Sequence, residues 1–238
     1  MPKDFFGSLF FCYDLTMNEQ EQAAYHLSVQ ANEIAEMSAR TAPFDTTVAG
    51  IEITVLPQVY PGGIDSELTS EAVGTANDLS VLDLCTGTGI VAVKAAMSGA
   101  RKVLAVDLNP EAVKNAVLNA DKFGLSQIEV REGSLFEPVG KMSFDIIAIN
   151  PPYTGKKPTN KTEICFWDED NKTTRQFFEQ YKEHLNPNGK VFLAWADFGS
   201  LELIRNLAKA NATRLEVVNS KSTPSGLATF LVYQLFAA

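Results

Sequence analysis

The chain has 238 residues, of which 45% are hydrophobic and 21% are charged, and its formal net charge is −9. This composition fits one large globular domain, or one domain with a small appendage. No apolar run approaches the roughly 20 residues that a membrane span needs. The apolar cluster at residues 9–12 lacks the basic segment and the small-residue cleavage site of a signal peptide. We therefore expect a cytoplasmic protein.

The three cysteines, Cys12, Cys85 and Cys165, are widely spaced and form no Cys-x-x-Cys pair. This pattern indicates reduced thiols and argues against both a disulfide framework and a zinc site. Since His26 and His184 are the only histidines, a histidine-based centre is not expected either. The sequence predicts no bound metal.

The negative charge is concentrated in the first third of the chain. Residues 1–80 contain twelve acidic side chains and two basic ones, a net charge of −10, and the remainder is +1. Proteins that bind long nucleic acids usually present a basic face. A protein or a small molecule is therefore the expected partner, nucleic acid is less favoured, and the oligomeric state is left open.

Residues 16–40 have the pattern of an amphipathic helix, with a capping box at Thr16 and Glu19. The three-to-four spacing predicts one apolar face, formed by Ala23, Ala24, Leu27, Ala31, Ile34 and Ala35. We expect residues 1–45 to form an N-terminal helical extension that packs on the main domain or lies over its cleft as a lid.

The main domain is expected to span residues 46–238. Its opening segments are a predicted hairpin, a turn and a helix, at 46–48, 51–56, 61–63 and 65–75. Asp65 or Ser66 is expected to cap that helix. Tyr60, just before the turn, is a candidate for contact with a substrate.

From Leu79 onwards, predicted strands alternate with predicted helices, which is typical of a parallel α/β sheet. The strands are expected at 81–85, 102–107, 127–131, 144–150, 190–196, 213–219 and 227–236, and the helices at 90–98, 110–123, 173–185 and 200–210. The predicted fold is α/β: a Rossmann-like, seven-stranded, mostly parallel, doubly wound sheet. Its last strand runs antiparallel, and an N-terminal helix and a β-hairpin are added.

A glycine-rich turn follows the first strand of this sheet. Gly87-x-Gly89-x-x-Ala92 satisfies the dinucleotide pattern G-x-G-x-x-G/A, and Asp107 ends the next strand, where NAD enzymes bind the ribose. Glycines there let the backbone approach a ligand, and the helix N-terminus offers unpaired N–H groups. These features alone leave NAD and another nucleoside cofactor about equally supported.

The segment Asn150-Pro151-Pro152-Tyr153 ends the strand predicted at 144–150. The prolines remove two N–H donors and fix two φ angles, and a residue before proline is held extended. The side-chain amide of Asn150 and the carbonyls of Asn150 and Pro151 are therefore expected to be available to a ligand, next to the cleft where open α/β sheets bind ligands.

Asp83 shifts the balance between the two cofactor classes. It lies at the end of the first strand, where NAD would bring its negatively charged pyrophosphate. A carboxylate there suits a ligand with an ammonium group better. S-adenosylmethionine, with a sulfonium and an ammonium group, fits this pattern.

The segments at 81–89, 106–110, 133–136 and 150–153 resemble those of class I S-adenosylmethionine-dependent methyltransferases. The likeness is greatest to the HemK/PrmC type, which methylates the glutamine amide of peptide-chain release factors, and to related amino methyltransferases of nucleic-acid bases. It covers roughly residues 50–236. It implies an S-adenosylmethionine site, with S-adenosylhomocysteine as the product and no metal.

The resemblance also implies roles for individual residues. The cofactor-binding residues would be Asp83, Cys85, Gly87, Gly89, Asp107, Leu108, Ser134, Leu135 and Asn150. The substrate nitrogen would lie at Asn150, Pro151 and Tyr153, the predicted catalytic residues, with Pro152 beside them. Trp167, in a charged stretch at 154–172, is a further candidate for substrate or lid contact.

The chain departs from the family pattern at several places. Cys85 stands at a position that is usually glycine, and Ser134 replaces the acid that usually meets the adenine amino group. Residues 61–67 only loosely echo the family's Pro-Arg-Pro-Asp-Thr-Glu. About 45 residues precede the predicted hairpin, fewer than the helical domain with which the bacterial release-factor enzymes dock their substrate. These departures weaken the release-factor assignment more than the cofactor assignment.

The predicted reaction is methyl transfer to a planar amide or amine nitrogen. Asn150 and the Pro151 carbonyl would accept the two N–H hydrogens of the substrate NH₂ and align its nitrogen with the sulfonium methyl, while Tyr153 stacks on the planar group. The acceptor could be a protein glutamine or a small molecule in a biosynthetic reaction, and a base in nucleic acid is less favoured. An NAD-binding oxidoreductase and a non-catalytic binding module remain as alternatives.

Overall fold

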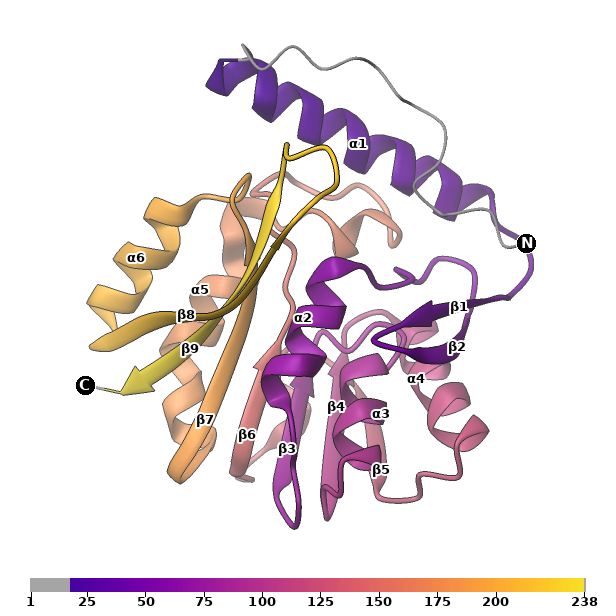
Figure 1. Ribbon diagram of the computed structural model, residues 1–238, viewed down its shortest axis with the longest axis vertical. Coiled ribbons are helices and arrows are strands. Elements are labelled where there is room, and N and C mark those ends of the chain that lie inside the picture. The colour runs from indigo at the N-terminus through magenta and orange to yellow at the C-terminus, as the bar shows by residue number, and fades with distance from the viewer. Residues whose placement is uncertain (1–17, 238) are drawn as a thin grey trace.

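The computed structural model describes residues 18–237, and its centre is the predicted seven-stranded sheet (Figure 1). The strands lie in the order β5-β4-β3-β6-β7-β9-β8. Their bounds are β3 Ser80–Leu84, β4 Lys102–Asp107, β5 Ile128–Glu132, β6 Phe144–Ile149, β7 Leu185–Ala196, β8 Thr213–Ser222 and β9 Thr229–Ala237. The five strands from β5 to β7 run parallel, and β9 is antiparallel to both of its neighbours. The predicted fold class is confirmed.

Helices cover both faces of this sheet (Figure 1). Their bounds are α2 Ile64–Val73, α3 Ile90–Met97, α4 Pro110–Lys122, α5 Lys172–Gln180 and α6 Leu201–Ala210. Successive strand residues point to opposite faces, so Val81 packs with α2 and α3 whereas Leu82 packs with α5 and α6. Because both faces are buried, the central strands consist mainly of apolar residues, as is typical of parallel sheets.

The hairpin of β1, Phe44–Val48, and β2, Ile51–Val55, is fixed to α4 by two fully buried asparagines. Asn115 accepts from the Leu56 amide at 2.7 Å and donates to the Thr54 carbonyl at 2.8 Å. Asn119 accepts from the Thr54 amide at 3.0 Å and donates to the Thr88 carbonyl at 2.8 Å. These bonds tie the hairpin to the glycine-rich turn and so position residues 57–66 beside it.

Some boundaries differ from those predicted. The first strand ends at Leu84, because Cys85 has a φ of 58°, in the left-handed region. The fifth helix ends at Gln180 and continues as a 3₁₀ turn over Tyr181–His184. Residues 186–189, between the predicted helix at 173–185 and the predicted strand at 190–196, lie within β7, as an irregularity opposite Asp145.

The N-terminal helix α1, Glu19–Ala39, lies across the carboxyl ends of the strands (Figure 1). Its N-cap is Asn18, which forms a capping box with Glu21. The predicted cap, Thr16, lies outside the described residues. Within them, no helix is long and apolar enough to cross a membrane.

The predicted apolar face of α1 is wrong except at Ile34. Ala23, Ala24, Leu27, Ala31 and Ala35 are exposed, and Leu27 is 41% accessible. The inward face instead comprises Tyr25, His26, Val29, Gln30, Glu33, Ile34 and Met37. The helix covers a partly polar cavity, so its inward face mixes polar and apolar side chains and the hydrophobic period does not identify it.

Candidate functional site

A cavity of about 480 Å³ lies at the carboxyl ends of β3, β4 and β6, beneath α1. Its wall comes from α1, residues 59–66, the turn after β3, the ends of β4 and β6, and the segment between β8 and β9. This is the edge where doubly wound sheets bind ligands. The cavity brings together nearly all of the predicted site residues.

The turn after β3 forms one wall of the cavity. Cys85, Gly87 and Gly89 all have positive φ, of 58°, 54° and 81°. Cys85 and Gly87 line the cavity, whereas Gly89 is not among its lining residues. A Cβ on Gly89 would lie 2.9 Å from the Cα of Ala116, so this glycine permits the close approach of α3 and α4. The left-handed conformation of Cys85 accounts for the usual glycine at that position.

Two buried acids stand at the ends of β3 and β4. Asp83 accepts from the Thr86 hydroxyl at 2.6 Å and from the Ala92 amide at 3.1 Å, and burial raises its pKa to about 7. Asp107 accepts from the amides of Gly87 at 2.9 Å and Asn109 at 2.9 Å, and burial raises its pKa as well. Both carboxylates are fixed by local bonds and line the cavity.

Another part of the cavity wall is less polar. Ser134 and Leu135 follow Gly133 and line the cavity, and Leu135 is buried. Leu108 also lines it, although 58% of its surface is exposed. An exposed leucine at a cavity rim offers an apolar surface to a ligand.

Asn150 and Pro151 stand at the end of β6, next to β3, where Leu84 pairs with Ile149. Within the described part of the chain, no N–H or O–H group donates to the Pro151 carbonyl. The Asn150 amide donates to Asp65 at 3.0 Å. Pro152 also lines the cavity.

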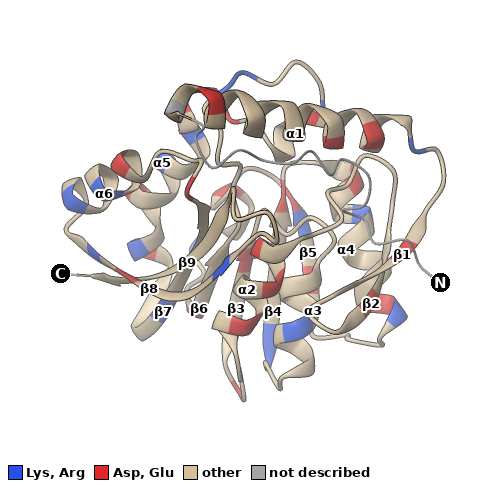
Figure 2. Cartoon of the chain, turned by 45° about the horizontal axis from the view of Figure 1, so that its top comes forward, with Lys and Arg blue, Asp and Glu red and all other residues tan. Residues whose placement is uncertain are grey.

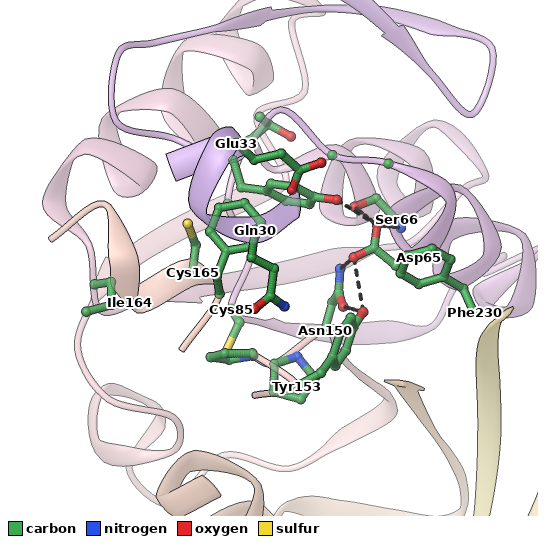
Figure 3. A pocket seen from close by; sticks show the side chains of 18 of the residues that line it. Gln30, Glu33, Asp65, Ser66, Cys85, Asn150, Tyr153, Ile164, Cys165 and Phe230 are labelled. Atoms are coloured by element: carbon green, nitrogen blue, oxygen red, sulfur yellow. Dashed lines mark hydrogen bonds between the residues drawn. The ribbon is translucent and has the colours of Figure 1, made fainter. Parts of the chain in front are cut away.

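Asp65 is hydrogen-bonded to several other side chains that line the cavity (Figure 3). Its Oδ2 accepts from Asn150 Nδ2 and from the Tyr153 hydroxyl, both at 3.0 Å. Its Oδ1 accepts from the Ser66 amide at 2.8 Å and from the Tyr60 hydroxyl at 3.3 Å. Asp65 is only 5% exposed. The predicted capping role is wrong, because Gly63 is the N-cap of α2 and Asp65 lies inside its first turn.

Tyr153 is held on both its polar and its apolar side. Its ring packs edge-on against Trp195 and Phe198, at centroid distances of 5.4 and 5.9 Å, and its hydroxyl also bonds to Asn150 Oδ1. Burial, followed by the charge of Asp65, raises the Tyr153 pKa well above its ordinary value. The hydroxyl therefore keeps its hydrogen and acts as a donor.

Helix α1 and the segment at 154–172 close the cavity from above. Tyr25, His26, Val29, Gln30 and Glu33 line it from α1. Ile164, Cys165 and Phe166 line it from the other segment. The α1 side chains and the segment at 154–172 together form the roof of the cavity.

Trp167 holds this roof together and is not among the residues that line the cavity. Its indole N–H donates to Gln30 at 3.0 Å, and Lys156 Nζ lies 3.5 Å from its ring centroid. Its ring packs with Ile34 and Met37. Tyr60, in contrast, lines the cavity, and its ring packs edge-on against Phe166 at 5.4 Å.

The cavity wall is acidic. It contains the carboxyl groups of Glu33, Asp65, Asp83 and Asp107, and no Lys or Arg among the described residues. Burial, followed by the charges of Asp65 and Glu36, raises the Glu33 pKa to about 7. Acidic side chains are also spread along α1 (Figure 2). A ligand that carries phosphate groups would find no Lys or Arg partner on this wall.

Asp65 and Glu33 were missed as site residues by sequence reasoning. Asp65 lies in the loose echo of the family's Pro-Arg-Pro-Asp-Thr-Glu, so a signal for it was present in residues 61–67. Glu33 carried no signal, because only the tertiary structure turns its face of α1 toward the cavity.

Comparisons with known proteins agree with this architecture. The family model described as "Methyltransferase small domain" matches residues 62–221. A candidate N5-glutamine methyltransferase of Methanocaldococcus jannaschii is 39% identical over 117 residues, which are 49% of this chain and 56% of that protein. A release factor glutamine methyltransferase of Geobacter sulfurreducens is 37% identical over 107 residues, 44% of this chain and 37% of that protein. The chain thus spans about half the length or less of these relatives.

Solved structures share the fold at lower identity. The Thermus thermophilus 16S rRNA N2 G1207 methyltransferase, in complex with AdoMet and guanosine, has a TM-score of 0.61 at 21% identity, covering 83% of this chain and 50% of that chain. A ribosomal protein L11 methylase of Lactobacillus delbrueckii has a TM-score of 0.57 at 22% identity, covering 74% and 80%. Since the family model matches well over half of the chain, and the motifs of that family line one cavity, the chain belongs to the methyltransferase small domain family, within the class I S-adenosylmethionine-dependent methyltransferases.

Proposed function

We propose that this protein is an S-adenosylmethionine-dependent N-methyltransferase that methylates the NH₂ nitrogen of a planar amide. The side chain of a protein glutamine is the preferred acceptor. The observation that carries the proposal is the end of β6. There, Asn150 and Pro151 lie on the wall of the same cavity as Asp83, Gly87 and Asp107. Two residues with hydrogen-bond acceptors, the Asn150 side chain and the Pro151 carbonyl, would thus adjoin the bound cofactor.

The residues present fit this cofactor. Asp107 has each oxygen bonded to one backbone amide, so each retains a lone pair for a ribose hydroxyl. Asp83 gives the methionine end of the ligand a carboxylate that an ammonium group can neutralise, and the absence of Lys and Arg among the described lining residues suits that ammonium. Leu108, Ser134 and Leu135 would enclose the adenine. Gly89 would act indirectly, through the packing of α3 on α4.

When bound, the cofactor supplies an electrophilic methyl group on sulfur. The chain's part is alignment. An amide nitrogen is a poor nucleophile because its lone pair is delocalised, and acceptance of its two hydrogens by Asn150 Oδ1 and the Pro151 carbonyl increases its electron density and fixes its direction. Tyr153, whose ring is held by Trp195 and Phe198, would fix the plane of the acceptor.

Protein glutamine is the preferred acceptor because the Methanocaldococcus jannaschii and Geobacter sulfurreducens relatives are both named for glutamine methylation. The roof formed by α1 and residues 154–172 favours a second candidate, a small molecule enclosed in the cavity. Nucleic acid is disfavoured by the acidic wall. Trp167 would serve the roof and not touch the acceptor.

The decisive experiment is mass spectrometry of a cell extract incubated with the enzyme and methyl-deuterated S-adenosylmethionine. Label on a glutamine amide of a protein is the expected result, and label on a metabolite would support the second candidate. Thermal shift assays with S-adenosylhomocysteine and with NADH test the cofactor. Stabilisation by NADH alone, without label in any fraction, would refute the proposal and favour an oxidoreductase.

A further inference from the structure

The Asp65 carboxylate is a buried charge that the transfer of a methyl group does not itself require. It comes from the first turn of α2, 85 residues before Asn150 in the chain, yet it meets the Asn150 amide at 3.0 Å and the Tyr153 hydroxyl at 3.0 Å. A carboxylate that is 5% exposed is costly to bury unless it is hydrogen-bonded or paired with a charge. Both bonds to Oδ2 come from the two side chains proposed to hold the methyl acceptor.

The bond to Asn150 determines which way its amide faces. A carboxylate accepts hydrogen bonds only, so it pairs with the NH₂ end of the amide and leaves Oδ1 as the end available to an N–H of the acceptor. With the amide reversed, Asn150 Nδ2 would face the N–H hydrogens of the substrate and repel them. The orientation of Asn150 is therefore set by a neighbouring group that can only accept.

Asp65 also offers the Tyr153 hydroxyl hydrogen a second hydrogen-bond acceptor. The Tyr153 hydroxyl has one hydrogen and two acceptors within reach, Asn150 Oδ1 and Asp65 Oδ2. When an N–H group of the methyl acceptor donates to Asn150 Oδ1, the Tyr153 hydroxyl can turn and donate its hydrogen to Asp65 instead. Because a buried donor without a partner costs free energy, this exchange lets Asn150 be engaged without leaving Tyr153 unsatisfied.

We propose that Asp65 is the positioning residue of the acceptor site, which orients the Asn150 amide and receives the Tyr153 hydroxyl hydrogen when the acceptor nitrogen binds. The inference rests on the proposed function. It adds a residue that acts through Asn150 and Tyr153, outside the Asn-Pro-Pro-Tyr segment. The acceptor it selects is a neutral or cationic N–H donor.

Sinefungin tests this proposal without an identified substrate. In this cofactor analogue, a carbon that bears a primary amine replaces the sulfonium and its methyl, so its ammonium hydrogens point toward the acceptor site. The ratio of its Kd to that of S-adenosylhomocysteine, measured by calorimetry, reports the acceptor end alone. We expect Asp65→Asn to weaken sinefungin about tenfold and to change S-adenosylhomocysteine binding less than twofold, because an amide in place of the carboxylate can also donate and so lets the Asn150 amide reverse. The matched control is Glu67→Gln, two residues further along α2, where Glu67 pairs with Lys221 at the surface.

A double-mutant cycle with Asn150→Asp makes the test specific. In Asp65→Asn/Asn150→Asp the amide and the carboxylate exchange places, so the pair is restored with one charge. We expect the change in its ratio of sinefungin Kd to S-adenosylhomocysteine Kd to differ at least tenfold from the product of the changes in the two single variants. Additive effects would overturn the proposal, as would an equal loss of S-adenosylhomocysteine binding in Asp65→Asn. If the wild type binds neither ligand, the proposed function fails instead.

Discussion

Gln30 of α1 and Trp167, which are 137 residues apart in the chain, are joined by a buried hydrogen bond of 3.0 Å from the indole N–H to the amide oxygen. The same amide bonds to the Thr154 hydroxyl at 3.1 Å. Gln30 is 6% exposed. These bonds link the two halves of the roof over the cavity, so the roof opens only if they break.

Gln30→Ala is expected to loosen the roof without unfolding the domain. Loss of these bonds should cost about 1–3 kcal/mol locally, because the indole N–H remains buried without an acceptor. Amides of α1 should exchange hydrogen faster, and those of β3 and β6 should keep their protection. Hydrogen exchange measured by mass spectrometry checks this. Asn32→Ala, on the exposed face of the same helix, is the control, and equal exchange in both variants would show that Gln30 does not hold the roof.

Asn150→Ala is expected to remove methyl transfer while leaving the cofactor bound. Since alignment of the acceptor nitrogen depends on Asn150 Oδ1, transfer of labelled methyl should fall on the order of 100-fold or more. The S-adenosylhomocysteine Kd should stay within about threefold. Transfer at the wild-type rate would contradict the role given to Asn150.

The pKa of Glu33 makes stability depend on pH. Burial and the charge of Asp65 raise this pKa to about 7 in the folded state, above its ordinary value of 4.5. Between these two pH values the Glu33 carboxyl is protonated in the folded state and ionised in the unfolded state. The stability that Glu33 contributes is therefore complete below about pH 4.5 and is lost as the pH rises through 7. Glu33→Gln, whose side chain stays neutral, should have a free energy of unfolding about 1–3 kcal/mol above that of the wild type at pH 8.

Urea unfolding at pH 5.5 and pH 8 checks this expectation. The difference in free energy of unfolding between Glu33→Gln and the wild type should increase as the pH rises. Glu36→Gln, on the exposed face one turn further along α1, should show a much smaller change. A gap that is constant with pH would show that Glu33 does not titrate in this range.

Gly89→Ala is expected to destabilise the fold more than a glycine substitution in open space. Its φ is 81°, and the new Cβ would lie 2.9 Å from the Ala116 Cα. Gly124, with a φ of 65° and nothing within 4 Å, shares the backbone penalty of about 1 kcal/mol but not the contact. Thermal unfolding of both alanine variants should place Gly89→Ala at least about 1 kcal/mol below Gly124→Ala. Equal losses would exclude close packing as the reason for this glycine.

The sequence by itself determined the sheet and its ligand-binding edge. Buried parallel strands are continuous apolar runs, and Gly87, Asp107 and Asn150-Pro151 stand directly after such runs, so their meeting at one edge follows from topology alone. The strand predicted to begin at residue 190 begins at Leu185, because the local pattern at 186–189 does not distinguish a loop from an irregularity inside a strand.

Only the tertiary structure decided what covers that edge and what sets its chemistry. The spacing in α1 indicated an alanine-rich face, but this helix packs over a partly polar cavity, so burial selected Gln30 and Glu33 instead. Asp65 had the local form of a helix cap, yet its carboxylate bonds to side chains 85 and 88 residues away. The hydrogen-bond partner of a polar side chain is determined by the tertiary structure, and a local sequence pattern does not indicate a partner that lies so far away along the chain.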